Sequence, residues 1–256
     1  MSRYQMMGGP IPLTPVAKKL IIINVVIWFV FVLVIQNLFL NTPYIFYYFG
    51  LLPEKTIMSY WIWQPFTYMF VHSNSVFHIL FNMLLLWWMG SDLEPRWGSK
   101  FFLSYYIICG VGAAIFYLLS VIIYYFVTGH MGLMTTPVVG ASGAVFGLML
   151  AFGMIFGERT VLFMMIFPMK AKYFVMLLGG IEVVTLINSG ESNGVANLAH
   201  IGGLLTGYLY LKFGLRLNRP KAAYSVKRRK SSLRLVVDNE KENNDQNPPQ
   251  GPKYWN

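Results

Sequence analysis

A serine and a histidine at the starts of two apolar stretches have the chemistry of a nucleophile and its base. Ser142 lies between Gly140 and Gly143 in the segment VVGASGAVFG, and His200 ends the segment ANLAH. A serine hydroxyl becomes an effective nucleophile when a base within hydrogen-bond reach takes its proton, and imidazole can accept and return a proton near neutral pH. The pair predicts covalent catalysis, with Ser142 attacking a carbonyl group and His200 acting as the base.

The segment HILFN adds two hydrogen-bond donors suited to an oxyanion. His78 and Asn82 lie four residues apart, a spacing that places side chains on one face of a helix. Both side chains can donate hydrogen bonds. Ser142 is expected near a helix N-terminus, where unpaired backbone N–H groups favour negative charge. We therefore predict an oxyanion site formed by His78, Asn82 and the backbone N–H of Ser142.

Each of these residues also has a purely structural interpretation. A serine at the start of a membrane helix is, by itself, more often a helix cap or a packing residue. His78 and Asn82 could form an interhelical hydrogen bond, and His200 could be an ordinary interfacial histidine. The occurrence of all four residues in three separate regions of one chain favours the catalytic interpretation.

The elements that must position these side chains are membrane helices. Of the 256 residues, 56% are hydrophobic and 12% are charged, a composition far more apolar than that of a soluble domain. A spanning helix needs ~20 mostly apolar residues. The predicted fold class is an all-α, polytopic bundle of six transmembrane helices, at about 19–40, 75–91, 101–127, 142–156, 172–188 and 198–215.

The approach to the fifth helix is interrupted by polar residues. Pro168, Lys170 and Lys172 break an otherwise apolar run, and lysines inside hydrocarbon are costly. We expect 160–169 to follow the membrane interface.

Basic residues predict the orientation of the bundle, because Lys and Arg concentrate in cytoplasmic segments. With six spans and a cytoplasmic N-terminus, Lys55 is alone among the 20 Lys and Arg residues in lying outside. Both termini are then cytoplasmic, and the second, fourth and sixth helices all begin at the outer side. This orientation brings His78, Ser142 and His200 to the same membrane depth.

Glycines at intervals of four predict that the fourth and sixth helices pack closely. Small residues at this spacing line one helix face and let two backbones approach in lipid. The fourth helix carries Gly143 and Gly147, followed by Ala151, and the sixth carries Gly203 and Gly207. Such a contact would place Ser142 and His200 at the same end of the helix pair.

We predict three regions along the chain: a cytoplasmic N-terminal segment (1–18), the six-helix domain (19–215) and a disordered cytoplasmic tail (216–256). The tail contains KRRK at 227–230 and is then polar, with too little apolar surface to fold. The net charge of +10 is explained by topology and by attraction to anionic lipid headgroups of the bilayer. We expect no nucleic-acid partner.

These motifs resemble those of the rhomboid family of intramembrane serine proteases. The resemblance runs from about Trp63 to Tyr208 and rests on HSNSVFHILFNMLLLWWMG, LEPRWGS, GASG and ANLAHIGG. It implies a catalytic dyad of Ser142 and His200, and Gly203 matches the close-packing glycine of the family.

The resemblance also assigns roles around the dyad. His78 and Asn82 match the pair that stabilises the oxyanion, and Phe146 matches an aromatic ring that lies against the histidine. The segment 41–72 resembles a partly membrane-embedded first loop, with Trp63-Gln64 where many members have Trp-Arg, and His72 is expected to order this loop. Glu94 is expected to fasten the connection between the second and third helices.

No acid is evident beside His200 in the sequence, which favours a dyad over a triad. Glu182, within the fifth helix, is expected to be a cavity-facing or hydrogen-bonded carboxylate outside the catalytic group. No HExxH motif or cysteine pair near a histidine is present, so we expect neither a metal nor another cofactor. The aspartate near a span, Asp92, lies at a cytoplasmic end, which argues against an aspartyl protease.

The resemblance implies an endopeptidase that cleaves single-span membrane proteins near the outer membrane face, in a bacterial inner membrane. One alternative is a noncatalytic rhomboid-like protein that binds transmembrane clients, against which the retained Ser142 and His200 argue. Another is a small-solute transporter, but the polar residues gather at one membrane face and do not continue across to the other.

Overall fold

The computed structural model describes residues 11–163, 166–188 and 194–214. Residues 1–10 of the predicted N-terminal segment and the predicted tail, with its contact to lipid headgroups, lie outside the described residues. Most of the described chain is helical, as the sequence predicts, and it forms a polytopic membrane bundle.

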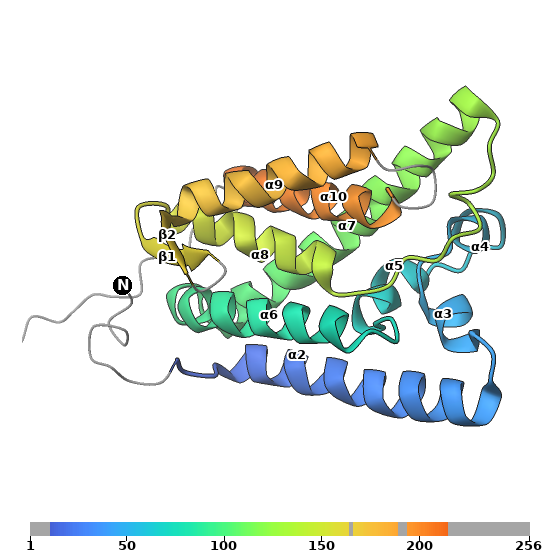
Figure 1. Ribbon diagram of the computed structural model, residues 1–256, viewed down its shortest axis with the longest axis horizontal. Helices are drawn as coiled ribbons and strands as arrows, with labels where there is room; N and C mark the ends of the chain where they lie inside the picture. The colour runs from blue at the N-terminus through green and yellow to red at the C-terminus, as the bar shows by residue number, and fades with distance from the viewer. Residues whose placement is uncertain (1–10, 164–165, 189–193, 215–256) are drawn as a thin grey trace, which may run out of the picture. The chain divides into compact units, whose positions relative to one another are not determined.

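Six long helices correspond to the six predicted spans (Figure 1). The first is α2 (Pro15–Val26), which continues in wider, π-type turns as η1 (Ile27–Leu40). The others are α6 (Val76–Trp97), α7 (Ser99–Thr128), α8 (Ser142–Ile155), α9 (Ala171–Asn188) and α10 (Val195–Leu209), the last extended by η3 (Tyr210–Gly214).

The centre of the bundle is formed by α7, α8 and α10, which pack against one another. Helix α9 lies against α8 and α10, α6 packs on α7 and α8, and α2 packs on α6 (Figure 1). Tyr105 Oη on α7 donates to the Gly147 carbonyl of α8 at 2.9 Å and joins these two helices, whereas Tyr68 Oη, from the first loop, donates to the Gly110 carbonyl of α7 at 2.7 Å. Both tyrosines are fully buried.

Helix α8 is shorter than a full span. Its 14 residues extend ~21 Å at ~1.5 Å per residue, whereas the hydrocarbon core of a bilayer is ~30 Å thick. By length and composition, the described helices that could cross a membrane are Pro15–Leu40, Val76–Trp97, Ser99–Thr128 and Ala171–Asn188. With 14 residues, α8 is therefore too short to cross the hydrocarbon core by itself, and Ser142 is its first residue.

The first loop is built from four short helical segments: α3 (Tyr44–Phe49), α4 (Pro53–Met58), α5 (Gln64–Thr67) and η2 (Tyr68–Phe70). The buried amide of Gln64 holds this loop together. Its Oε1 accepts hydrogen bonds from Leu52 N at 3.0 Å and Thr56 Oγ1 at 2.7 Å, and its Nε2 donates to the Tyr47 carbonyl at 2.9 Å. Gln64, in the position of the family's arginine, is therefore a structural residue of the loop.

The segment before the fifth helix, which we expected to follow the membrane interface, forms a β-hairpin that its sequence does not indicate. Strands β1 (Thr160–Phe163) and β2 (Phe167–Lys170) are antiparallel, with Thr160 opposite Lys170. The two lysines near its end reach the carboxylate of Glu158, which pairs with Lys170 at 2.6 Å and also with Lys172. The charges of Lys170, at the end of β2, and Lys172, in the first turn of α9, are thus held beside an acidic residue.

Candidate active site

Ser142 begins α8 two residues after Gly140, a glycine in a conformation that side chains disfavour. Gly140 has φ of +125°, and a Cβ atom at this position would lie 2.7 Å from His78 Nε2 and 3.8 Å from Ser142 Oγ. Only glycine fits both the backbone angle and the space. The glycine therefore lets the loop bring Ser142 close to the His78 ring.

The structure brings Ser142 and His200 into direct contact between two helices. Ser142 Oγ and His200 Nε2 are 2.7 Å apart, a hydrogen-bond distance at which the hydroxyl can donate to a neutral imidazole. The His200 side chain is 17% exposed, so water can reach it only in part. This is the contact that nucleophilic catalysis requires.

Phe146 fixes the plane of the His200 ring. It lies one turn after Ser142 on α8, and its ring stacks on that of His200 with centroids 4.3 Å apart and planes at 9°. Stacking limits rotation of the imidazole about its side-chain bonds, so Nε2 stays directed at Ser142.

The glycines of α8 and α10 explain why the two helices approach so closely. A Cβ atom on Gly203 would overlap the carbonyl oxygen of Gly143, and one on Gly207 would lie 3.2 Å from the Cα atom of Gly147. Gly203 and Gly207 of α10 thus lie against Gly143 and Gly147 of α8, as their spacing in the sequence implies. The close approach of the two backbones sets the distance between Ser142 and His200.

His78 presents its Nε2 atom toward the start of α8. Its Nδ1 atom accepts from the backbone N–H of Ser73 at 3.4 Å and lies 2.9 Å from Ser73 Oγ. A neutral imidazole that accepts at Nδ1 carries its proton on Nε2, which is the atom beside Gly140. His78 is therefore oriented as a donor toward the space next to Ser142.

Asn82 lies one turn after His78 on the same face of α6 and is buried. Its Nδ2 atom donates to the His78 carbonyl at 2.8 Å. Because an amide carries two N–H groups, this bond leaves a second donor for a ligand. The structure places Asn82 beside His78, while the described contacts of its side chain lie within its own helix.

His72 orders the segment that leads into the serine. Its side chain is completely buried, and its Nε2 atom accepts from the backbone N–H of Ala141 at 3.4 Å. Burial, together with the nearby His78, lowers the pKa of His72 to about 3. The ring is therefore neutral near pH 7 and acts as an acceptor that anchors the residue before Ser142.

The expectation that no acid lies beside His200 is wrong. Glu182 Oε2 is 3.0 Å from His200 Nδ1, and the same oxygen accepts a hydrogen bond from Asn197 Nδ2 at 2.6 Å. Glu182 is separated from His200 in sequence by the end of α9 and a connection, so the sequence does not show that the two face each other. The sequence did contain one indication of this contact: Glu182 is an acidic residue in an apolar helix, and such a residue needs a polar partner.

Comparison with known proteins identifies the family. A family model, the rhomboid domain, matches residues 59–217. The chain belongs to the rhomboid family. It is 30% identical over 211 residues to rhomboid protease AarA of Providencia stuartii, an alignment that covers 78% of this chain and 72% of AarA.

Other rhomboid relatives match this chain over only part of their own length. Rhomboid protease GluP of Bacillus subtilis is 28% identical over 179 residues, covering 68% of this chain and 30% of GluP. Rhomboid-like protein 19 of Arabidopsis thaliana is 26% identical over 185 residues, covering 71% of this chain and 56% of that protein. The family therefore includes bacterial and plant proteins that share this core within chains of different length.

A second polar cluster in this rhomboid protein lies at the opposite ends of the helices and is structural. Glu94 accepts from the backbone N–H groups of Val16 and Ala17 at 3.0 and 3.1 Å, and from Ser99 Oγ at 2.6 Å. It thereby caps the start of α2 and joins α6 to α7. Nearby, Arg159 Nη1 pairs with Asp92 Oδ2 at 2.7 Å.

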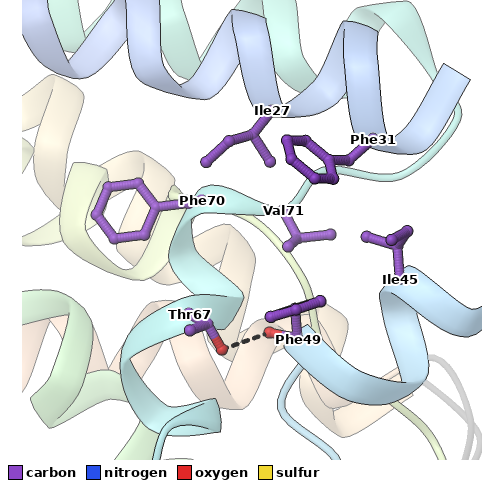
Figure 2. A pocket seen from close by; sticks show the side chains of 7 residues that line it. All are labelled: Ile27, Phe31, Ile45, Phe49, Thr67, Phe70 and Val71. Carbon is purple, nitrogen blue, oxygen red and sulfur yellow. Dashed lines mark hydrogen bonds between the residues drawn. The ribbon is translucent and has the colours of Figure 1, made fainter. Parts of the chain in front are cut away.

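Two further features bear on chemistry. Among the described residues, no group of three His, Cys, Asp or Glu side chains is arranged to hold a metal ion. A pocket of about 280 Å³ lies between η1 and the first loop (Figure 2). Its lining is Ile27, Phe31, Ile45, Phe49, Thr67, Phe70 and Val71, and the Thr67 hydroxyl is already bonded to the Phe49 carbonyl at 2.8 Å. The pocket therefore supplies no group for catalysis.

Proposed function

We propose that this rhomboid protein is an intramembrane serine endopeptidase in which Ser142 is the nucleophile and His200 the general base. The observation that carries the proposal is the 2.7 Å contact between Ser142 Oγ and His200 Nε2. The family membership and the protease relatives AarA and GluP support the same activity.

The reaction follows from the positions of these atoms. His200 Nε2 takes the hydroxyl proton as Ser142 Oγ attacks the peptide carbonyl, giving a tetrahedral intermediate. The resulting oxyanion receives hydrogen bonds from His78 Nε2, Asn82 Nδ2 and the backbone N–H of Ser142. When the C–N bond breaks, His200 returns the proton to the leaving amine. A water molecule, deprotonated by His200, then hydrolyses the acyl-enzyme and frees Ser142.

The substrates in this proposal are single-span membrane proteins, cleaved near the outer membrane face. The short α8 supports this depth, because a helix of 14 residues is too short to cross the hydrocarbon core and can begin below the surface of the bilayer. A peptide bond inside a helix is shielded by backbone hydrogen bonding. Spans that contain small or helix-breaking residues can unwind into the site and are the expected substrates. We place both termini in the cytoplasm of a bacterial cell, with the bundle in the inner membrane.

The test is cleavage of a model single-span substrate by the purified protein, together with labelling by a serine-directed fluorophosphonate. Ser142→Ala and His200→Ala should abolish cleavage and Ser142→Ala should abolish labelling, while the melting temperature stays nearly constant. Ser104→Ala is a matched control, because this exposed serine on α7 bonds only back to the Lys100 carbonyl among the contacts described. Substantial cleavage by Ser142→Ala would exclude the proposal. An inert wild-type protein would favour the noncatalytic alternative.

A further inference from the structure

A line of hydrogen-bonding atoms connects three helices behind the serine. Ser142 Oγ on α8 meets His200 Nε2 on α10 at 2.7 Å. On the other side of the ring, His200 Nδ1 lies 3.0 Å from Glu182 Oε2 on α9. The carboxylate in turn accepts from Asn197 Nδ2 at 2.6 Å. Helix α9 packs along both α8 and α10 (Figure 1), which allows this arrangement.

An ionised Glu182 would be energetically unfavourable in its apolar surroundings without a hydrogen-bonding partner. Its side chain is 14% exposed, and its neighbours Ile181 and Val183 are 45% exposed on the outer surface of an apolar helix. Ionised side chains within membrane helices turn inward and pair with donors. Two donors face Glu182 Oε2, namely the amide of Asn197 and the Nδ1 edge of His200. Asn197 lies one turn before His200 on the same face of α10.

The contact between His200 Nδ1 and Glu182 Oε2 is suited to orienting His200 as the base. With Nδ1 carrying a proton that points toward a carboxylate, Nε2 is left as the acceptor for the Ser142 hydroxyl. Once Nε2 takes that proton, the positive imidazolium is adjacent to the negative Glu182 oxygen. The carboxylate keeps its charge throughout and takes no proton. In this structure the Nδ1 and Oε2 atoms are 3.0 Å apart, but they are not aligned as a hydrogen bond.

We propose that Glu182 is a positioning residue that orients and stabilises His200, so that the catalytic group is a serine, histidine and glutamate held by Asn197. This inference rests on the proposed serine protease function. It differs from that function in assigning part of the rate to a third helix, α9, which carries neither the nucleophile nor the base.

A purely structural role for Glu182, as a link between α9 and α10, makes different predictions. Such a link would lower stability and the fraction of folded protein when broken, but it would leave the turnover of each correctly folded site unchanged. Turnover should therefore be normalised to the number of Ser142 side chains that a fluorophosphonate labels at completion. This normalisation separates lost sites from slow sites.

The experiment compares Glu182→Gln and Glu182→Leu with wild type, using the full chain in detergent and a single-span substrate. Glutamine keeps the shape and an acceptor oxygen but removes the charge, whereas leucine removes both. We expect Glu182→Gln to lower normalised kcat on the order of 10-fold and Glu182→Leu on the order of 100-fold, because a residue that orients the base should contribute no more than the lower end of the ~10²–10⁴-fold range of general-base effects. KM should change less than about twofold, because neither variant alters substrate binding.

Val183→Thr is the matched control, since it changes polarity without size at the exposed neighbouring position of α9. It should cleave like wild type. Wild-type normalised kcat in Glu182→Gln and Glu182→Leu would overturn the role of Glu182 while leaving the serine protease function intact. If wild type neither cleaves substrate nor labels at Ser142, the proposed function fails and this inference fails with it.

Discussion

At the scale of single residues, the approach of His78 to Ser142 depends on a position that has no room for a side chain. Gly140 has a φ of +125°, and a Cβ atom added at this position would lie 2.7 Å from His78 Nε2. A non-glycine residue at a positive φ costs ~1–3 kcal/mol of strain. A collision with the ring would in addition displace a donor of the proposed oxyanion site.

Gly140→Ala should therefore lose both stability and turnover, whereas Gly129→Ala should lose stability alone. Gly129 also has a positive φ, +73°, but no atom lies within 4 Å of its predicted Cβ position. Removing one oxyanion donor in a serine protease costs on the order of 10²–10³ in turnover, and a displaced His78 should approach that loss. Melting temperature and kcat measured for both variants check this. Equal kcat values would show that His78 has no role in the reaction.

The sequence was sufficient to predict that Ser142 and His200 lie together, because residue type, the alternating direction of the helices and the glycine spacing all point to this pair. It could not show that Glu182 faces His200. That contact depends on the rotation of α9 about its axis, and apolar residues occur all around this helix, so periodicity gives no direction. The hydrogen bond from the Ala141 backbone N–H to His72 could not be predicted either, because a backbone N–H is present at almost every residue and the sequence does not show which one a loop histidine meets.

At the scale of the helices, the distance between nucleophile and base is set by the backbones of α8 and α10. Gly203→Val should push the helices apart, because even a Cβ atom there would overlap the Gly143 carbonyl. A displacement of ~1 Å can cost ~10²-fold in rate. We expect Gly203→Val to lose most activity and to melt at a lower temperature, although it touches neither Ser142 nor His200.

Leu209→Val is the control for this variant, since Leu209 lies on the same helix and is 44% exposed. It should be nearly silent in cleavage and melting assays carried out side by side. A Gly203→Val protein that cleaves and melts like wild type would mean that α8 and α10 do not depend on this glycine contact.

The hairpin before α9 makes a prediction about pH. Lys170 and Lys172 bind the exposed Glu158 and lower the pKa of its carboxyl group from 4.5 to about 2. A group whose pKa is lower in the folded state adds stability above its unfolded pKa, and this contribution is lost as the pH falls toward the folded value. Glu158→Gln should thus melt slightly below wild type near neutral pH, with the difference shrinking as the pH falls from 4.5 toward about 2.

Melting curves of both proteins at about pH 7 and about pH 3, at low and high salt, measure this difference. Salt should also reduce it, because these charges are exposed. A difference that is the same under all these conditions would mean that Glu158 acts through packing and not through its charge.

The helices themselves were largely predictable and the irregular elements were not. Apolar length located the six long helices to within six residues at each boundary, the largest difference being at the end of α6 (Trp97, against a predicted 91). The same criterion treated 142–156 as a span, although the 14 residues of α8 are too few to cross the hydrocarbon core. The hairpin was missed because Thr160–Phe163 and Phe167–Lys170 are stabilised by pairing with each other, and short apolar runs do not distinguish a strand from a helix approach.

At the scale of the whole molecule, the side of the membrane on which cleavage occurs depends on the orientation of the bundle. The first loop and the Ser142 end of α8 are joined directly, because Leu51 and Val138 form an antiparallel bridge with N to O distances of 2.8 and 2.9 Å. The hairpin lies at the other end of α8. The orientation of these two segments therefore decides whether Ser142 opens toward the outside or toward the cytoplasm.

Single cysteines introduced into these two segments test the orientation. The native Cys109 is buried, so a Cys109→Ala background leaves one reactive thiol in each variant. Ser59→Cys, at an exposed position of the first loop, should react with a membrane-impermeant maleimide on intact cells. Lys170→Cys, where the native side chain is 49% exposed, should react only after the membrane is permeabilised, because basic segments stay in the cytoplasm. The reverse pattern would place Ser142 near the cytoplasmic face, and cleavage near the outer face would then be excluded even if the serine and histidine act as proposed.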